Sequence, residues 1–305
     1  MVQIRKAQRK VTKARVGISG PSGSGKTLSA LLMAYGMTGD WDKVGLIDTE
    51  NKSADLYAET VKAGVHIPEF PKIDIEPPYT TEKYIEALKA FEDYGVEAII
   101  VDSLSHAWAG EGGILEQKDQ VAKAKGGNSY TAWGEMTPKQ NKFVEAILKS
   151  KCHIYATMRS KTEYILEQND RGKQVPRKVG MAPVQRDGLE YEFTLVFDLT
   201  ADHMATVSKD RTGLFDGQYF IPTVDTGKQL LEWLESGEKL ISKDMLVKIS
   251  TKWIELGQNP EHIDAQTKKL YGSELGAITE KQAEAFLQTL IDAMKAKQET
   301  EQKGA

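Results

Sequence analysis

Residues 20–27 read Gly-Pro-Ser-Gly-Ser-Gly-Lys-Thr, which fits the pattern GxxxxGK[ST] of loops that bind nucleotide phosphates. A β-branched run at 15–19 precedes this phosphate loop, and a helical stretch at 27–37 follows it. Glycines let successive backbone N–H groups face one anion, and the helix N-terminus adds a favourable dipole. We therefore expect nucleotide contacts from Gly20, Pro21, Ser22, Gly23, Ser24, Gly25, Lys26, Thr27 and Leu28.

Two side chains of the loop and one later carboxylate have further roles in this chemistry. Lys26 can reach the β- and γ-phosphates, and the Thr27 hydroxyl can ligate Mg²⁺. Asp102 closes the apolar strand AIIVD, where a carboxylate would hold Mg²⁺ through water. The alternative for Asp102 is a carboxylate that caps a turn at the strand end. The pattern predicts ATP and Mg²⁺ as cofactors.

The elements that must position these residues alternate between strands and helices. We expect strands at 15–19, 44–48, 97–103, 153–158, 192–200 and 203–209, and helices at 27–37, 81–95 and 138–150, with Pro138 in the first turn of the last helix. Continuous apolar strands between helices favour an α/β fold with a mostly parallel sheet covered on both faces.

Beyond about residue 225 the pattern changes to short amphipathic helices. We therefore divide the chain into a basic N-terminal extension at 1–14, an α/β core at 15–236, and a small helical C-terminal domain with a frayed tail at 237–305.

Composition excludes several classes of protein. The 305 residues are 40% hydrophobic and 28% charged, the balance of a globular chain, and no apolar run approaches the ~20 residues of a membrane-spanning helix. Cys152 is the one cysteine, which excludes an internal disulfide and a cysteine-cluster metal site. We expect a cytoplasmic protein without membrane partners. The net charge of −4 means that nucleic acid would have to bind to local basic patches.

Two segments provide such patches, and we expect both to be loops that contact single-stranded DNA. Residues 171–186 carry five cations and no acid, which suits contacts to the phosphate backbone. Residues 110–133 combine cations with Tyr130 and Trp133, on which bases could stack. Solvated loops, or loops that order around the nucleotide, are the alternative. The cations of the two segments are Arg171, Lys173, Arg177, Lys178 and Arg186, and Lys123 and Lys125.

Several stretches resemble known ATPases. LIDTENKSADLYA (46–58) and IIVDS (99–103) are similar to strands of RecA-type recombinases. TMRSK (157–161), the segment 181–200 and VSKDRTGLF (207–215) resemble bacteriophage nucleotide-binding proteins of the AAA type, some of which are recombination or single-strand-annealing ATPases. The resemblance covers about residues 15–225. It implies a RecA-like core, a homo-oligomer (ring or filament), and a role on phage DNA in the bacterial host, with other phage recombination or single-strand-binding proteins as partners.

The resemblance also points to a catalytic carboxylate. RecA-type ATPases carry the carboxylate that polarises the attacking water on the strand next to the phosphate loop, whereas AAA+ proteins carry it beside the metal-binding aspartate. Here Ser103 follows Asp102 and cannot act as a base, so the resemblance implies Glu50, just after the strand at 44–48. A solvated loop acid is the alternative.

Three cations have implied roles on the γ-phosphate. Lys209 and Arg211 resemble the Lys-x-Arg element that reaches a neighbouring subunit's nucleotide, although a charged turn is the alternative. Arg159 occupies the usual position of a γ-phosphate sensor, for which Lys161 is the other candidate.

These features together predict a P-loop ATPase, stimulated by DNA, that acts in phage recombination or replication. The rival interpretation is a nucleotide-dependent assembly or adaptor protein with little turnover. A small-molecule kinase is a third, which no recognisable acceptor site supports.

Overall fold

The computed structural model describes the backbone of residues 9–168 and 174–303, and the side chains of residues 9–161 and 181–297. The chain divides into two compact units. One comprises Lys13–Leu231, and the other comprises Met1–Thr12 with Glu232–Ala305. Each is described by itself.

The larger unit is built on a mostly parallel sheet, as the strand–helix alternation predicts. In the described residues it has eight strands, in the order β10-β9-β1-β7-β6-β2-β5, with β8 paired to β7. β10 and β8 are the antiparallel members. The strands are β1 (Arg15–Gly20), β2 (Val44–Asp48), β5 (Lys72–Asp74), β6 (Ala98–Asp102), β7 (His153–Gln168), β8 (Gln174–Pro183), β9 (Leu195–Leu199) and β10 (Ala205–Asp210). A separate hairpin joins β3 (Thr60–Lys62) to β4 (Val65–Ile67).

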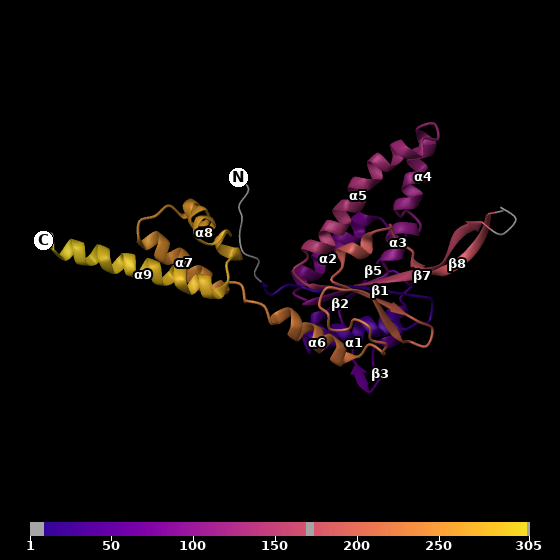
Figure 1. The fold of residues 1–305 in the computed structure, drawn as a ribbon, viewed down its shortest axis with the longest axis horizontal. Helices are drawn as coiled ribbons and strands as arrows, with labels where there is room; N and C mark the ends of the chain where they lie inside the picture. Colours follow the sequence, from indigo (N-terminus) through magenta and orange to yellow (C-terminus); the bar gives the residue numbers. More distant parts are fainter. Residues whose placement is uncertain (1–8, 169–173, 304–305) are drawn as a thin grey trace. The chain divides into compact units, whose positions relative to one another are not determined.

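Helices cover both faces of this sheet, as Figure 1 shows, with α1 on one side and α2 and α5 on the other. The core on the second side combines apolar residues of α2 and α5 with those of β6 and β7. The helices of this unit are α1 (Lys26–Thr38), α2 (Thr81–Tyr94), α3 (Leu104–Ala109), α4 (Ile114–Ala124) and α5 (Ser129–Lys149), and α6 (Val224–Glu235) begins in it.

Three local predictions are wrong. Residues 110–133 are not a loop, because α4 and the start of α5 occupy most of them. Most of the segment 171–186 is not a loop either, since Gln174–Pro183 form β8, which pairs with β7 as the two-stranded ribbon of Figure 1, while residues 171–173 lie outside the described part of the chain. The glycine and proline of this segment are tolerated because β8 is an edge strand. Pro138 lies inside α5 and not in its first turn, because Asn128 caps the helix ten residues earlier through the Thr131 N–H.

The smaller unit is helical. Its helices α7 (Lys243–Glu255), α8 (Ile263–Tyr271) and α9 (Glu280–Lys303) enclose a small core that includes Ile249, Trp253 and Phe286. The described part of the basic N-terminal extension belongs to this unit, since Arg9 accepts a backbone hydrogen bond from Glu238 (2.8 Å). Across both units, no described helix is long and apolar enough to cross a membrane.

Helices α1 and α6 approach so closely that only glycine fits at the contact. A Cβ at Gly36 would lie 2.0 Å from the Val224 carbonyl oxygen, and one at Gly227 would lie 2.0 Å from the Met33 carbonyl oxygen. Both distances are far below any real Cβ contact. The two backbones therefore pack directly against each other.

We predict that Gly36→Ala lowers the free energy of unfolding by at least 1–3 kcal/mol, roughly the cost of overpacking. The matched control is Gly134→Ala, a helical glycine of α5 with no atom near its Cβ position. This control should raise the free energy of unfolding by about 1 kcal/mol. Urea unfolding of the full chain measures both, and equal stabilities of the two variants would contradict the close α1–α6 contact.

Candidate functional site

The phosphate loop connects the end of β1 to the start of α1. Gly25 immediately precedes the helix with φ of 84°, a left-handed conformation that favours glycine. The Lys26 ammonium group donates a hydrogen bond to the Pro21 carbonyl oxygen (2.7 Å), so the side chain lies across its own loop. Burial lowers the pKa of Lys26. The loop thus has the backbone geometry and the cation that phosphate binding requires.

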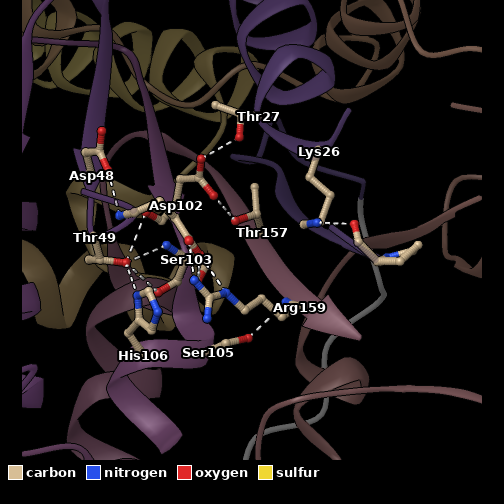
Figure 2. A network of polar contacts seen from close by, with 12 residues as sticks. Lys26, Thr27, Asp48, Thr49, Asp102, Ser103, Ser105, His106, Thr157 and Arg159 are labelled. Carbon is tan, nitrogen blue, oxygen red and sulfur yellow. Dashed lines mark hydrogen bonds and ion pairs between the residues drawn. The ribbon is translucent and has the colours of Figure 1, made fainter. Parts of the chain in front are cut away.

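Asp102 is the buried centre of the site, and it is only 3% exposed at the end of β6. Thr27 donates a hydrogen bond to one carboxylate oxygen (2.6 Å), and Thr157 of β7 donates to the other. Figure 2 shows both hydroxyls directed at this carboxylate. Burial raises the pKa of Asp102, and the two hydroxyl donors oppose that rise. The site therefore holds a desolvated carboxylate between β6, β7 and the phosphate loop.

These donors fit a magnesium ion. Mg²⁺ prefers oxygen ligands, and proteins usually hold it through one or two carboxylates together with substrate phosphates. Thr27 and Asp102 provide such oxygens next to the phosphate loop. The described residues contain no cluster of three or more His, Cys, Asp or Glu that could hold a metal alone. The substrate phosphates would thus have to supply part of the coordination.

Glu50 lies beside this centre and is held by two partners. Ser103 donates to Oε1 (3.0 Å), and the Arg159 guanidinium binds both carboxylate oxygens. Burial alone would raise the pKa of Glu50, but the hydrogen bond and charge of Arg159 outweigh it and lower the pKa. Glu50 is therefore ionised, and in this conformation Arg159 occupies the oxygens that a water would need.

The position of Glu50 in the sheet corrects one expectation. Its preceding strand, β2, is not next to β1, because β7 and β6 lie between them. Instead β2 pairs with β6, with Asp48 opposite Asp102 in the register. Glu50 therefore lies at the site because β2, the strand before it, is next to β6, which carries the candidate metal ligand Asp102.

Several functional neighbours have no motif in the sequence. Besides Thr157 and Ser103, the Thr49 hydroxyl lies 2.8 Å from Nδ1 of His106 and accepts a hydrogen bond from the Ser103 N–H (2.9 Å). The Arg159 N–H donates to the Ser105 hydroxyl (2.9 Å). These contacts brace the segments that carry Glu50 and Asp102 (Figure 2). Only Thr49 and Ser103 carry a signal in the sequence, because each directly follows an acidic residue that ends an apolar strand.

The structure places the Lys209–Arg211 pair at the end of β10, in a turn that Asp210 organises. The Asp210 carboxylate accepts hydrogen bonds from the backbone N–H groups of residues 212, 213 and 215. Lys209 and Arg211 donate to the backbone carbonyl of Tyr191 in the same chain. The side chains of Lys209 and Arg211 are thus held against the backbone carbonyl groups of residues 190–191.

The candidate DNA-binding residues are dispersed. Arg171 and Lys173 lie outside the described residues. Arg177 and Lys178 belong to β8, where they pair with Ile165 and Tyr164 of β7. The remaining candidates are Arg186, which donates to Asn141, Lys125, which pairs with Glu135, and Lys123, which is exposed on α4.

Comparison with known families decides the class of the larger unit. A family model described as an AAA domain matches residues 12–244, more than half of the chain. The chain belongs to this AAA-domain family. No curated protein matches it. The AAA domain supports a nucleotide-binding P-loop ATPase, in agreement with the phosphate loop and the mostly parallel sheet.

We predict that Asp102→Asn makes the nucleotide-free AAA domain more stable. The amide is nearly isosteric and removes a buried charge. Its oxygen can accept a hydrogen bond from one of the two threonine hydroxyls, and its NH2 group can donate to the other hydroxyl. A gain of about 1 kcal/mol would raise the melting temperature by ~2–4 °C. The same variant should lose the additional stabilisation that Mg²⁺ gives in the presence of ATP. Thermal melts with ATP, with and without Mg²⁺, check both effects, and a less stable variant that keeps the Mg²⁺ effect would contradict them.

Proposed function

We propose that this chain is a RecA-like ATPase that hydrolyses ATP with Mg²⁺ and acts on single-stranded DNA. The observation that carries the ATPase proposal is the convergence of four groups at one edge of the sheet. Lys26 and Thr27 follow β1, Glu50 follows β2, and Asp102 ends β6, and a hydrogen bond connects Thr27 to Asp102. Ligands of open α/β sheets bind at this carboxyl edge.

Each group has a defined task in the proposed reaction. The loop N–H groups and Lys26 would bind the β- and γ-phosphates. Thr27 and Asp102 would hold Mg²⁺, which would supply positive charge to neutralise the phosphates. Glu50 orients the attacking water and accepts its proton. It can do so only once Arg159 releases at least one of its oxygens. The γ-phosphate is the anion to which the Arg159 guanidinium would then turn.

DNA binding is proposed on the basis of the ribbon of β7 and β8. The segment 171–186, which includes β8, carries five cations and no acid, which suits sequence-independent phosphate contacts. The resemblance to phage recombination ATPases supports the same role, together with DNA-stimulated hydrolysis, other phage recombination proteins as partners, and the cytoplasm of a bacterial host. We further propose that the chain forms a homo-oligomer in which Lys209 and Arg211 act on a neighbour's nucleotide.

One observation favours a second candidate function. The bidentate Arg159–Glu50 pair occupies the proposed base in this conformation. If that pair persists with nucleotide bound, ATP would order the site without rapid turnover. The chain would then be a nucleotide-dependent assembly or adaptor protein.

The first functional prediction separates binding from hydrolysis. Lys26→Ala should abolish hydrolysis and weaken ATP affinity, because it removes a direct phosphate contact. Glu50→Gln should abolish hydrolysis but keep ATP bound, because it removes only the charge that polarises water. Turnover with and without single-stranded DNA, together with equilibrium ATP binding, measures both effects. Wild-type turnover by Glu50→Gln would refute Glu50 as the base, and negligible turnover by the wild-type chain would favour the adaptor.

The second concerns the ribbon. Neutralising Arg177 and Lys178 should weaken single-strand binding similarly for all sequences, and should flatten the slope of log affinity against log salt by about 0.7 for each lost contact. The control neutralises Lys243 and Lys248, which are exposed on α7. An unchanged slope with intact DNA binding would show that the two ribbon cations do not contact DNA.

The third tests a shared active site. Arg211→Ala and Lys26→Ala should each be nearly inactive, since loss of a trans-acting cation can cost 10³–10⁵ in rate, on the order seen in GTPases. A mixture should regain part of the activity, because some interfaces then pair an intact loop with an intact cation. The control is co-assembly of the two folded variants. If the two variants co-assemble and the mixture stays inactive, Arg211 does not act on a neighbouring subunit, and Lys209 and Arg211 form only a charged turn.

A further inference from the structure

A cavity of about 390 Å³ lies between the sheet and the segment 181–190, at the carboxyl ends of β1 and β9 and beside Met158 of β7. Three of its lining residues form one transverse row of the sheet. Ser19 of β1 pairs in register with Met158 on one side and with Asp198 on the other. Residues in register on parallel strands present their side chains to the same face. The row therefore forms one surface of the cavity.

The chemistry of the lining is that of a site for a small planar ring. Met158, Leu189 and Val196 are buried and apolar, and thioethers make favourable contacts with aromatic rings. Seven of the thirteen lining residues are polar, among them Asp198 and its hydrogen-bond partner Ser208. Apolar side chains that contact the faces of a ring, together with polar groups that hydrogen-bond to its edge, are typical of small-molecule sites and of pockets for flipped bases.

The charges of the lining disfavour a phosphate. Three carboxylates line the cavity against a single cation, Arg186. An anion would meet net repulsion there, whereas an amino group on a ring can donate to a carboxylate oxygen. Aspartate accepts from the exocyclic amine of cytosine in this way. The lining therefore favours a neutral heterocycle that carries an amino group.

The location indicates where such a ring would come from. Residues 181–183 line the cavity and are also the end of β8, so the site lies at the base of the ribbon that carries the basic segment. Ser19 immediately precedes the phosphate loop. A single strand held along the ribbon by its phosphates would have its bases within reach of the cavity.

We propose that this cavity takes up one unstacked, amino-bearing nucleobase of a bound single strand, with Asp198 accepting a hydrogen bond from the amine. The proposal rests on the proposed single-strand binding. It adds a base contact to binding that is otherwise independent of sequence. Because Ser19 of β1 lines the cavity, a base bound there would also lie next to the phosphate loop.

The test compares three labelled oligomers of equal length, oligo-dC, oligo-dT and an abasic backbone, by fluorescence anisotropy with the full chain. We expect oligo-dC to bind about tenfold more tightly than oligo-dT, the discrimination of one good base contact. Asp198→Asn should abolish this preference without changing affinity for the abasic backbone. Asp216→Asn, an exposed acid outside the cavity, should keep the preference.

A second variant and a competitor keep the test decisive. Ser208→Leu introduces bulk from an exposed position of β10, and it should weaken binding of oligo-dC but not of the abasic backbone. Free deoxycytidine should compete only weakly, and competition equal to that of the oligomer would overturn the single-strand source. Equal binding of all three oligomers by wild type would overturn the base site alone. Failure to bind any oligomer would refute both this inference and the proposed DNA binding.

Discussion

The constraint on which the site depends is the burial of the Asp102 carboxylate at the end of β6. A desolvated carboxylate is costly, and here two hydroxyls, from Thr27 and Thr157, provide its hydrogen bonds. Those two contacts connect β6 to the phosphate loop on one side and to β7 on the other. The burial that destabilises the ionised form of Asp102 also makes this carboxylate suited to bind a cation.

The second feature follows from the position of β7 between β1 and β6. One continuous strand carries Thr157, which contacts Asp102, and Arg159, which binds Glu50, and then extends into the ribbon with β8. A ligand bound to the ribbon would therefore contact the same strand whose Arg159 binds the proposed base, Glu50. If DNA binds to the ribbon as proposed, this continuity is a physical route by which it would alter the Arg159–Glu50 pair.

The sequence predicts the central strands and helices well, because each is a continuous apolar run or an amphipathic stretch with a clear end. The helix at 81–95 ends at Gly95 as expected, and the strand at 97–103 appears as β6. The strand β8 is harder to predict from the basic segment, because Pro176 and Gly180 are typical of loops but are tolerated on an edge strand. Within the site, the motif identifies Lys26 and Thr27, whereas Thr157, Ser103 and Ser105 depend on strand order and register, which local sequence does not encode.

The most direct test of the account is whether the metal and the nucleotide share one site. Mn²⁺ can replace Mg²⁺ as a spectroscopic probe, and electron–nuclear double resonance on the full chain reports which phosphorus nuclei lie beside it. The account predicts Mn²⁺ binding that depends on ATP, with ³¹P couplings in the wild-type chain. Mn²⁺ that binds equally well without nucleotide, or that shows no ³¹P coupling when ATP is saturating, would contradict it.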